Sequence, residues 1–532
     1  MTTRRIEIYD TTLRDGTQGR DINVSVEDKL ILTRKLDEFG VDYVEGGMPG
    51  SNPKDEQYFE KASTLPLKNA KIVAFGATAR KATKVRVDDN IHRLLKSEAP
   101  IITLFGKTWR FHSKESLGIS DDENAELIFN SVNYLVEAGR DVFFDAEHFF
   151  DGYRDDPDFA LRMLQAAAEG GATRLVLCDT NGGCLPTDVA RIVADVVSKV
   201  RVPVGIHSHN DGELAVANAM AAIDSGATHA QGTINGIGER CGNCNLCSLV
   251  PNLLLKKGND LGNLNDNLAH LTGLSRFFDE LTNQIPNHRL AYVGKSAFTH
   301  KGGIHVSSVL KDSRMYEHIT PETVGNKRDV IVSELSGKSN IHYIAREAGI
   351  DLGEDVQFSS NFVQRIKELE HEGFQFDGAG ASLRLMLLRE LKQYEPFFKI
   401  TYAKVNDMFD ENGAKYSESV MKIQVDGVTE HTAADGNGPV NALDQAMRKA
   451  LVRFYPELAK VHLLDYKVRV LDGHDGTQAK VRVHIESGDK EETWSTVGVS
   501  PDIIEASLTA LYDSMNYKIF KDNLISRATV KQ

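Results

Sequence analysis

The sequence predicts an α/β protein that begins with a (β/α)8 TIM barrel and continues through helical linker subdomains to a C-terminal α+β domain. Between residue 6 and about residue 260, short apolar runs alternate with longer helical patterns, which is typical of parallel strands joined by crossover helices. These apolar runs number eight, the number that closes a barrel. We place the barrel at residues 1–265, the linker subdomains at 266–395 and the C-terminal domain at 396–532.

The eight predicted strands are short and evenly spaced. They are Ile6 to Asp10, Tyr43 to Gly47, Lys71 to Gly76, Ile101 to Gly106, Val142 to His148, Arg174 to Thr180, Val202 to His209 and His229 to Asn235. An open doubly wound sheet is the structural alternative, but such a sheet does not normally contain eight evenly spaced units. The barrel is therefore the preferred fold.

The segments between these strands have the start and stop signals of helices. Ser25 followed by Asp28 resembles a capping box, and Gly40 stands where a C-cap glycine belongs. Similar helical patterns cover residues 121–138, 157–169, 186–200 and 212–225, with Gly139, Gly170 and Gly226 as the expected stops.

The chain changes character after residue 265. The stretch to about residue 345 is rich in loops, and helical patterns follow near residues 356–371 and 380–393. The last part contains an internal echo of strands followed by a helix. Strands at 420–425 and 429–433 precede a helix that opens at Pro439, and strands at 480–485 and 492–497 precede one that opens at Pro501. The turns before both helices could hold a carboxylate on free amides, or simply cap helices in a dimerisation domain.

Composition excludes several classes of protein. The 532 residues include 76 acidic and 62 basic ones, and the net charge of −14 argues against non-specific binding to nucleic acid or an anionic membrane. No apolar run approaches the length of a membrane span, and the first ten residues lack the apolar core of a signal peptide. We therefore expect a cytoplasmic protein whose partners are small molecules.

The cysteines predict reduced thiols, because five is an odd number and the chain shows no export signal. Cys241, Cys244 and Cys247 form a C-x2-C-x2-C run that could belong to an iron–sulfur site. The ferredoxin pattern needs a fourth cysteine at position 251, which is Pro. The favoured interpretation is that the three side chains pack as small apolar groups.

Polar residues gather at the carboxyl ends of the predicted strands, which is where barrel enzymes place their chemistry. They are Arg14 with Asp15, Glu45, Glu147, Asp179 with Thr180, His207 with His209, and Asn235 leading to Glu239 and Asn243. Arg14 offers a rigid fork of donors to an anion, and Asp15 is a hard oxygen ligand for a divalent cation. Taken alone, an Arg-Asp-Gly turn would more often be an exposed ion pair.

The histidines at 207 and 209 are separated by one residue on a strand, so both imidazoles should project to the same face. Together with Asp15 and Asn243 they would provide two nitrogen and two oxygen ligands at one rim. Such a set suits Zn, Mn, Co or Mg and does not choose among these metals.

These motifs carry a family resemblance. The segments are Asp10-Thr-Thr-Leu-Arg-Asp-Gly16, the Glu147 strand, His207-Ser-His-Asn210, Gly238-Glu-Arg-Cys-Gly-Asn243, Gly302-Gly-Ile-His305 and the C-terminal domain. Their order and spacing resemble the acetyl-CoA-dependent 2-oxoacid synthases of the isopropylmalate, homocitrate and citramalate group, which are metal-dependent barrels related to hydroxymethylglutaryl-CoA lyase. The resemblance covers nearly the whole chain.

The resemblance implies a role for each site residue. Asp15, His207, His209 and Asn243 would hold the metal. Arg14 would stabilise the oxyanion and Thr180 would bind the carboxylate of the 2-oxoacid. Among the residues that move protons, Glu147 would act in hydrolysis, and His305 assisted by Tyr316 would deprotonate the acetyl methyl group.

The resemblance also implies an acceptor and partners. Isopropylmalate synthases typically read Arg-Asp-Gly-Glu-Gln, whereas this chain has Thr17 in place of Glu. The residues that follow resemble the long citramalate form, which implies pyruvate as acceptor, a place in isoleucine biosynthesis through 2-oxobutanoate, isoleucine as feedback effector and a homodimer. Another 2-oxoacid as acceptor, a lyase that cleaves a 3-hydroxyacyl-CoA, and a non-catalytic amino-acid sensor are the alternatives.

Overall fold

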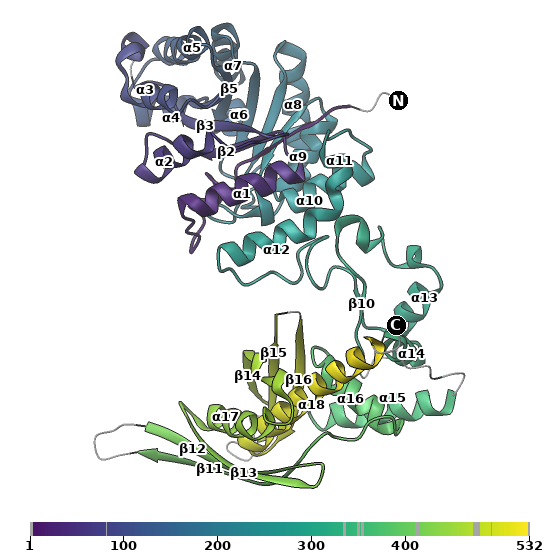
Figure 1. Ribbon diagram of the computed structural model, residues 1–532. Helices are drawn as coiled ribbons and strands as arrows, with labels where there is room; N and C mark the ends of the chain where they lie inside the picture. The colour runs from purple at the N-terminus through teal and green to yellow at the C-terminus, as the bar shows by residue number, and fades with distance from the viewer. Residues whose placement is uncertain are drawn as a thin grey trace. The chain divides into compact units, whose positions relative to one another are not determined.

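The computed structural model describes residues 4–80, 82–333, 337–347, 352, 356–409, 415–471, 479–490 and 492–529. The chain forms two compact units. The first contains Met1–Phe298 and Ile319–Lys327, and the second contains Thr299–His318 and Arg328–Gln532. Figure 1 shows the course of the chain through both. No helix among the described residues is both long and apolar enough to cross a membrane.

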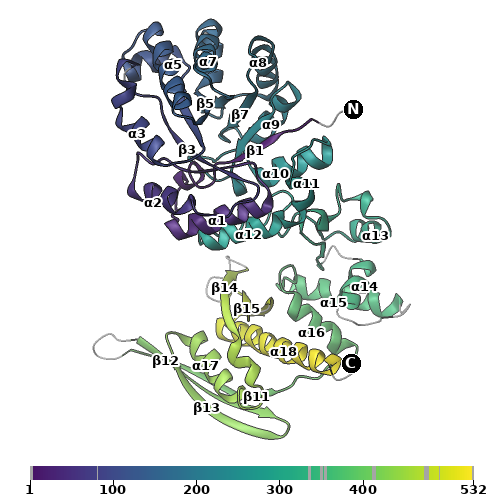
Figure 2. The ribbon, with the colours of Figure 1, turned by 45° about the horizontal axis from the view of Figure 1, so that its top comes forward.

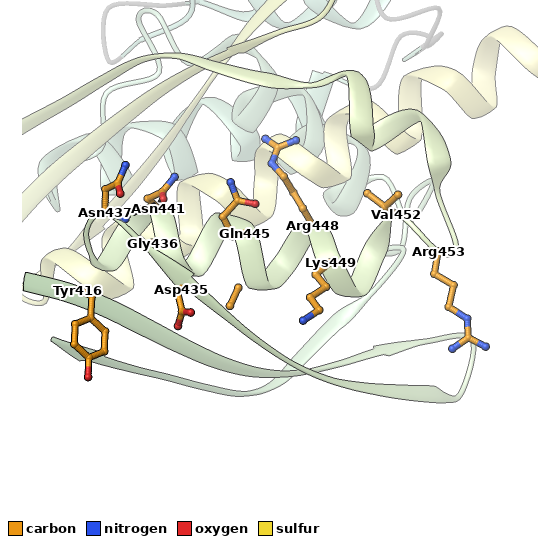
Figure 3. A pocket seen from close by; sticks show the side chains of 11 residues that line it. Tyr416, Asp435, Gly436, Asn437, Asn441, Gln445, Arg448, Lys449, Val452 and Arg453 are labelled. Carbon is orange, nitrogen blue, oxygen red and sulfur yellow. Dashed lines mark hydrogen bonds between the residues drawn. The ribbon is translucent and has the colours of Figure 1, made fainter. Parts of the chain in front are cut away.

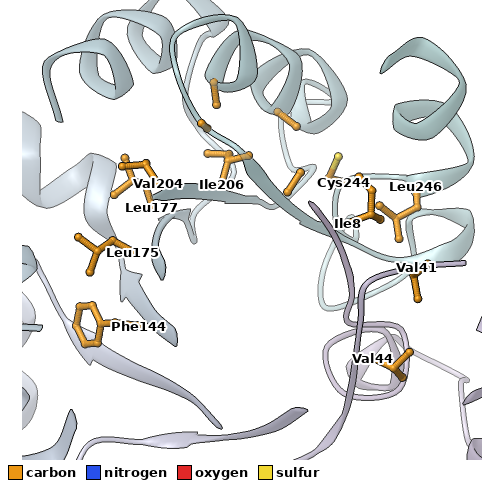
Figure 4. Close-up of a cluster of buried hydrophobic side chains, with 14 of the residues drawn as sticks. Ile8, Val41, Val44, Phe144, Leu175, Leu177, Val204, Ile206, Cys244 and Leu246 are labelled. Carbon is orange, nitrogen blue, oxygen red and sulfur yellow. The ribbon is translucent and has the colours of Figure 1, made fainter. Parts of the chain in front are cut away.

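The first unit is a closed barrel of eight parallel strands in sequential order, which confirms the predicted fold class. The strands are β1 (Glu7–Asp10), β2 (Tyr43–Gly47), β3 (Lys71–Ala77), β4 (Ile101–Lys107), β5 (Asp141–Glu147), β6 (Arg174–Asp179), β7 (Val204–Ser208) and β8 (His229–Gly232). Every strand lies where its apolar run predicted it. The largest core cluster fills the space between these strands and the helices around them (Figure 4).

Helices cover the outside of the barrel. They are α1 (Val26–Phe39), α2 (Pro53–Ala62), α3 (Asp89–Lys96), α4 (Arg110–His112), α5 (Asp121–Glu137), α6 (Phe149–Asp155), α7 (Pro157–Gly170), α8 (Pro186–Lys199), α9 (Ala215–Asp224), α10 (Leu246–Pro251), α11 (Leu264–Asn267) and α12 (Leu271–Leu281). The capping box of Ser25 and Asp28 forms, and Gly40 ends α1 at φ +101° in the left-handed region. The prediction for α7 was wrong by one residue, because Gly170 is still helical and Gly171 has the left-handed C-cap conformation.

Four strands end earlier than predicted: β5 at Glu147, β6 at Asp179, β7 at Ser208 and β8 at Gly232. β8 stops at Gly232, because Asn235 has φ +59° and the chain turns into a short 3-10 helix. A side chain at Gly232 would lie 2.4 Å from the Cys244 carbonyl, so the returning chain passes directly over this position. β7 stops at Ser208, and His209 instead forms an isolated bridge with Asn243. Because β7 ends at Ser208, the predicted metal ligand His209 pairs with the loop beyond β8.

The amino-terminal end of the barrel interior is filled by aromatic rings and an ion pair. Tyr9, Tyr43 and Phe143 belong to one buried cluster. Beneath them, Arg174 donates two hydrogen bonds of 2.8 and 2.7 Å to the carboxylate of Glu7. Burial alone would raise the pKa of Glu7, but the hydrogen bonds and charges of Arg174 and His229 lower it well below its usual range. This ion pair ties β1 to β6 across the barrel.

The second unit combines helices with two small antiparallel sheets (Figure 2). Its first elements are β9 (Thr299–His300), α13 (Gly303–Lys311), β10 (Asp329–Val330), α14 (Lys338–Glu347), α15 (Val356–His371) and α16 (Gly380–Glu390). Two repeats follow: β11 (Lys399–Phe409), β12 (Lys415–Val425), β13 (Val428–Gly436) and α17 (Pro439–Leu451), then β14 (His462–Val470), β15 (Val481–Gly488), β16 (Thr493–Ser500) and α18 (Ile503–Thr529). Both predicted echoes of strands and helix are confirmed, and each also has a first strand that the sequence pattern missed.

The Glu7–Arg174 pair predicts a pH-dependent stability. Glu7→Gln should lower the free energy of unfolding by about 2 kcal/mol near neutral pH, since a charged hydrogen bond between half-buried groups is lost. The pKa of Glu7 is lower in the folded chain, so its contribution is present above the unfolded pKa of about 4.3 and declines as pH falls below it. Urea unfolding at several pH values measures both effects.

The matched control for this measurement is Glu38→Gln. Glu38 pairs with Lys35 on the exposed surface of α1, where its side chain is 64% accessible. Its loss should change stability by less than about 0.5 kcal/mol. Equal effects of the two substitutions at neutral pH would contradict the stabilising role of the buried pair.

Candidate metal and active site

Asp15, His207 and His209 converge at the carboxyl-terminal rim of the barrel. Asp15 lies in the turn after β1, His207 on β7 and His209 just beyond β7. The two imidazole Nε2 atoms are 3.4 Å apart, and Asp15 Oδ2 lies 3.7 Å from that of His207 and 3.9 Å from that of His209. All three residues are buried. Within the described residues, this is the group of histidine, cysteine and acidic side chains arranged to hold a metal ion.

The spacing and protonation states of these ligands fit a divalent cation. The centre of a triangle with those edges lies about 2.1 Å from each corner, and metal–ligand distances to N and O are about 2.0–2.2 Å. Burial lowers the pKa of His207, and burial together with the neighbouring His207 lowers that of His209 to about 4. Burial opposes ionisation of Asp15, but Arg14 and both imidazoles hold its pKa below the usual range. The group therefore offers one carboxylate and two neutral imidazoles at neutral pH.

Asn243 completes this arrangement from the loop after β8. Its Nδ2 donates to Asp15 Oδ1 at 2.8 Å, while its Oδ1 is buried with no hydrogen-bond partner among the described residues. A buried amide oxygen without a partner is costly unless something else binds it. Gly238 makes room for this side chain, because a Cβ there would lie 2.2 Å from Asn243 Nδ2 and the backbone has φ +149°. The unpartnered oxygen fits the predicted fourth ligand.

Arg14 is held between two carboxylates. Its Nε donates to Glu45 Oε2 at 2.6 Å and its Nη1 donates to Asp15 Oδ2 at 2.8 Å. The guanidinium carbon lies 3.7 Å from the ring centroid of Phe75 on β3. Glu45, which is fully buried on β2, also accepts hydrogen bonds from Tyr9 and Thr11. Sequence reasoning placed Glu45 at the rim but assigned it no role, because nothing local to β2 indicates that it binds Arg14.

Glu147 and Thr180 lie at the ends of adjacent strands. The last residues of β4 and β5 are in register, and Lys107 Nζ lies 2.5 Å from Glu147 Oε2. Lys107 was not among the predicted site residues, because nothing in the sequence near β4 indicates that it pairs with a residue 40 positions away. The Thr180 hydroxyl accepts a hydrogen bond of 2.9 Å from the backbone N–H of His148. Its own hydrogen remains available to an anion such as a carboxylate.

His305 and Tyr316 belong to the second unit. His305 is exposed on α13, and its ring stacks on that of Tyr316 with centroids 4.1 Å apart. Tyr316 is 45% exposed and the neighbouring Ile304 is 78% exposed. The structure thus brings these two predicted catalytic residues together on one accessible surface.

The cysteine run has a structural role. Cys244 and Cys247 are completely buried in the barrel core, where burial raises the pKa of each thiol to about 12, and Cys241 is exposed. Among the described residues these three form no ligand cluster. The favoured prediction of small apolar packing groups is confirmed for Cys244 and Cys247.

The second unit contains a hollow beside the amino-terminal end of α17 and along the exposed face of that helix (Figure 3). Its volume is about 770 Å³. Asp435, Gly436, Asn437 and Asn441 line the part at the helix start, and Gln445 continues it along α17. The helix begins after Gly438 without a side-chain cap. This is one of the two turns in which the sequence suggested a carboxylate site.

Comparison with known proteins places this geometry in a family. The HMGL-like family model matches residues 5–277, which is just over half of the chain. The chain belongs to the HMGL-like family. A homocitrate synthase post-HMGL domain-like model matches residues 292–373, and a LeuA allosteric (dimerisation) domain model matches residues 377–519. The buried Asp-His-His group is consistent with a divalent metal site of the HMGL-like family.

Several relatives are similar to this chain along its whole length, beyond the residues that the HMGL-like model matches. The chain is 50% identical to an (R)-citramalate synthase of Geobacter sulfurreducens, with 98% of each chain covered. It is 48% identical to an (R)-citramalate synthase of Aquifex aeolicus, over 97% of this chain and 98% of that one. A probable 2-isopropylmalate synthase of Methanopyrus kandleri is 32% identical, over 96% and 98%. All three are similar to this HMGL-like chain along its whole length.

The site geometry predicts that Asp15→Asn abolishes tight binding of a divalent metal. The substitution removes the one charged ligand, so Mn²⁺ affinity should fall by at least about 100-fold. The free-Mn²⁺ signal in electron paramagnetic resonance measures this affinity without any substrate. Asp195→Asn is the matched control, because Asp195 lies on α8 and binds Tyr153 and Lys199. Unchanged Mn²⁺ binding by Asp15→Asn would contradict the metal site.

Proposed function

We propose that this chain catalyses the condensation of acetyl-CoA with pyruvate and the hydrolysis of the resulting thioester, giving citramalate and CoA. The observation that carries the proposal is the 50% identity, over 98% of both chains, to an (R)-citramalate synthase. The product would feed isoleucine biosynthesis through 2-oxobutanoate. The polar rim supports a reaction of this kind, because it supplies metal ligands, a buried guanidinium and a carboxylate in one place.

Four side chains would hold the metal. When bound, a divalent cation would supply Lewis acidity toward the keto and carboxylate oxygens of the 2-oxoacid. Asp15 contributes the charge that the neutral imidazoles lack, and Asn243 fixes one carboxylate oxygen of Asp15 while leaving its own Oδ1 unpartnered. The ligand set is Asp15, His207, His209 and Asn243. Mn, Mg, Zn and Co are all compatible with these donors.

Arg14 and Thr180 would bind the substrate anions. Arg14 donates hydrogen bonds from Nε to Glu45 and from Nη1 to Asp15. We propose that its Nη2 donates to the substrate. The fixed guanidinium is oriented before an oxyanion develops on the keto oxygen, which is how preorganised donors lower a barrier. Thr180 would donate its hydroxyl hydrogen to the carboxylate of pyruvate.

Three residues would move protons. His305, assisted by the stacked Tyr316, would take a proton from the acetyl methyl group, and the resulting enolate would attack the keto carbon. The alkoxide that forms on the keto carbon would take this proton back from His305. Glu147 would then take a proton from the water that attacks the thioester carbonyl and pass it to the CoA sulfur as the C–S bond breaks. Lys107 holds this carboxylate at the end of β5.

The LeuA allosteric (dimerisation) domain supports regulation and assembly. We infer a homodimer in which His305 of one chain reaches the barrel of its partner. The exposed Ile304, His305 and Tyr316 support this inference, because large apolar and aromatic groups at such a surface are typical of an interface. Isoleucine is the proposed effector, and the hollow beside α17 has polar side chains, among them Asn437, Asn441 and Gln445, that could hydrogen-bond an amino acid.

The substrate assignment predicts that pyruvate releases CoA from acetyl-CoA faster than any other 2-oxoacid does. The full chain is incubated with acetyl-CoA, Mn²⁺ and either pyruvate, 2-oxoisovalerate or 2-oxoglutarate, and the free thiol is measured with a thiol-reactive dye. A methylene or two changes binding in an apolar pocket by about 1–3 kcal/mol, so the preference for pyruvate should be roughly 10-fold or more.

Other outcomes identify the alternatives. Release with 2-oxoisovalerate or 2-oxoglutarate and none with pyruvate would replace the acceptor and leave the reaction type intact. Release with none of them would overturn the proposed activity and favour a lyase or an amino-acid sensor. Activity that persists in Asp15→Asn would show that the reaction does not use the proposed site.

The dimer inference predicts complementation between two inactive variants. Asp15→Asn damages the barrel site and His305→Ala damages the second unit, so each homodimer should be inactive. Random mixing at equal amounts should restore about a quarter of the wild-type rate, because half of the dimers contain one intact composite site. The rate is measured after the mixture has been unfolded and refolded together. No recovery, with heterodimers demonstrated by differently tagged chains, would place His305 in its own chain's site.

A further inference from the structure

We propose that Gln231 and Asp145 form a positioning relay that sets the tautomer of His207 and so presents its Nε2 to the metal. Gln231 contacts His207, but neither Gln231 nor Asp145 is itself a proposed metal ligand, and the sequence predicted no role for either. The inference rests on the metal role proposed above for His207. It concerns how the protein prepares that ligand before any metal or substrate binds.

The relay consists of two hydrogen bonds across the interior of the barrel. His207 Nδ1 lies 2.8 Å from Gln231 Oε1, and Gln231 Nε2 donates to Asp145 Oδ1 at 3.1 Å. The three residues lie on β7, β8 and β5, and their exposed fractions are 5%, 1% and 3%. At this degree of burial no water competes freely for these groups, so their mutual contacts determine their orientation.

The first hydrogen bond selects the tautomer. An amide oxygen can only accept, so the hydrogen of the neutral imidazole must be on Nδ1 of His207 and the lone pair must be on Nε2. That Nε2 is the atom 3.7 Å from Asp15 Oδ2, inside the proposed metal site. Metal-binding histidines commonly donate their second ring N–H in this way, which orients the ring and raises its basicity.

The second hydrogen bond selects the orientation of the amide. Gln231 could rotate by half a turn and present its NH2 group to His207, which would force the hydrogen onto Nε2 and block the metal. Asp145 opposes this rotation because its Oδ1 accepts the amide hydrogen. Burial and the nearby Glu45 raise the pKa of Asp145. Oδ1 accepts the amide hydrogen when the group is a carboxylate, and also when it is neutral with its proton on Oδ2. Asp145 thus acts on His207 through Gln231.

The two imidazoles of the site differ in this respect. His209 Nδ1 is buried without a hydrogen-bond partner among the described residues. The tautomer that the protein fixes is therefore that of His207. Because Gln231 sets the tautomer of His207 and nothing comparable acts on His209 in the part of the chain that the structure describes, we expect substitution of Gln231 to weaken metal binding strongly although Gln231 does not itself bind the metal.

The experiment measures Mn²⁺ affinity of the purified full-length chain by electron paramagnetic resonance, without substrates. Gln231→Met keeps the length of the side chain and removes the acceptor, and it should weaken Mn²⁺ binding by about 10- to 100-fold. Asp145→Leu, which lets the amide of Gln231 turn, should cause a loss of similar size. Gln165→Met is the matched control, because Gln165 is an exposed residue on α7 and contacts Glu169. This control should bind Mn²⁺ like the wild type.

A rescue variant separates the relay from simple damage to the fold. Gln231→Glu combined with Asp145→Asn exchanges the carboxyl and the amide, so an acceptor again faces His207 Nδ1 and a donor again joins the two residues. This double variant should recover Mn²⁺ affinity to within a few-fold of the wild type. A melting temperature close to that of the wild type in each variant shows that the chain is folded.

Two results would overturn the proposal. One is wild-type Mn²⁺ affinity in folded Gln231→Met under conditions in which Asp15→Asn no longer binds the ion. The other is a folded double variant that binds Mn²⁺ as weakly as Gln231→Met, because that would show that the amide and carboxyl do not act as a donor–acceptor chain. Both results are obtained without pyruvate or acetyl-CoA. If the proposed activity fails, this test still stands, because Mn²⁺ binding is measured separately from the reaction.

Discussion

The guanidinium of Arg14 is the interaction on which the rim of the barrel depends. It lies between two buried carboxylates, with Glu45 at 2.6 Å and Asp15 at 2.8 Å, and it packs on the ring of Phe75. Removing one member of a buried ion pair costs about 3–5 kcal/mol, because an uncompensated charge remains. Arg14 has two such partners, one in the turn after β1 and the other on β2. The same contact thus orders the first two strand ends and fixes Asp15, a proposed metal ligand.

This interaction also leaves the rim with a particular charge. One guanidinium cannot neutralise two carboxylates, and burial keeps both site imidazoles neutral near pH 7. Asn243 donates to Asp15 through its Nδ2 and leaves its own Oδ1 buried without a partner among the described residues. A buried site with surplus negative charge and an unpartnered amide oxygen favours a divalent cation, since isolated buried charge is otherwise costly. The charge balance of Arg14 and its partners therefore makes this rim suited to a divalent cation, consistent with the Asp-His-His group.

Much of the fold was predictable because its signals are local. The apolar runs marked all eight barrel strands, and Ser25 with Asp28 marked the start of α1. The histidine pair was predictable because side chains two residues apart on a strand share a face. Contacts between distant strands were not predictable. The pairing of Arg14 with Glu45 joins residues 31 positions apart, and that of His207 with Gln231 joins residues 24 positions apart. Neither partner carries a local sign of the other, so only the closed barrel reveals them.

Thr17 shows how a sequence marker can differ from a specificity determinant. Its hydroxyl lies 2.9 Å from the carbonyl oxygen of Arg14 and 3.2 Å from that of Leu13, so it donates its hydrogen to the backbone of its own turn. A hydroxyl engaged in this way has no second hydrogen to offer a substrate. Thr17 nevertheless lines a hollow of about 580 Å³ that includes Arg14. The proposed effect of Thr17 on acceptor choice would come from the space and neutrality that it leaves beside Arg14, because a glutamate there would add a third carboxylate next to a guanidinium that already binds two.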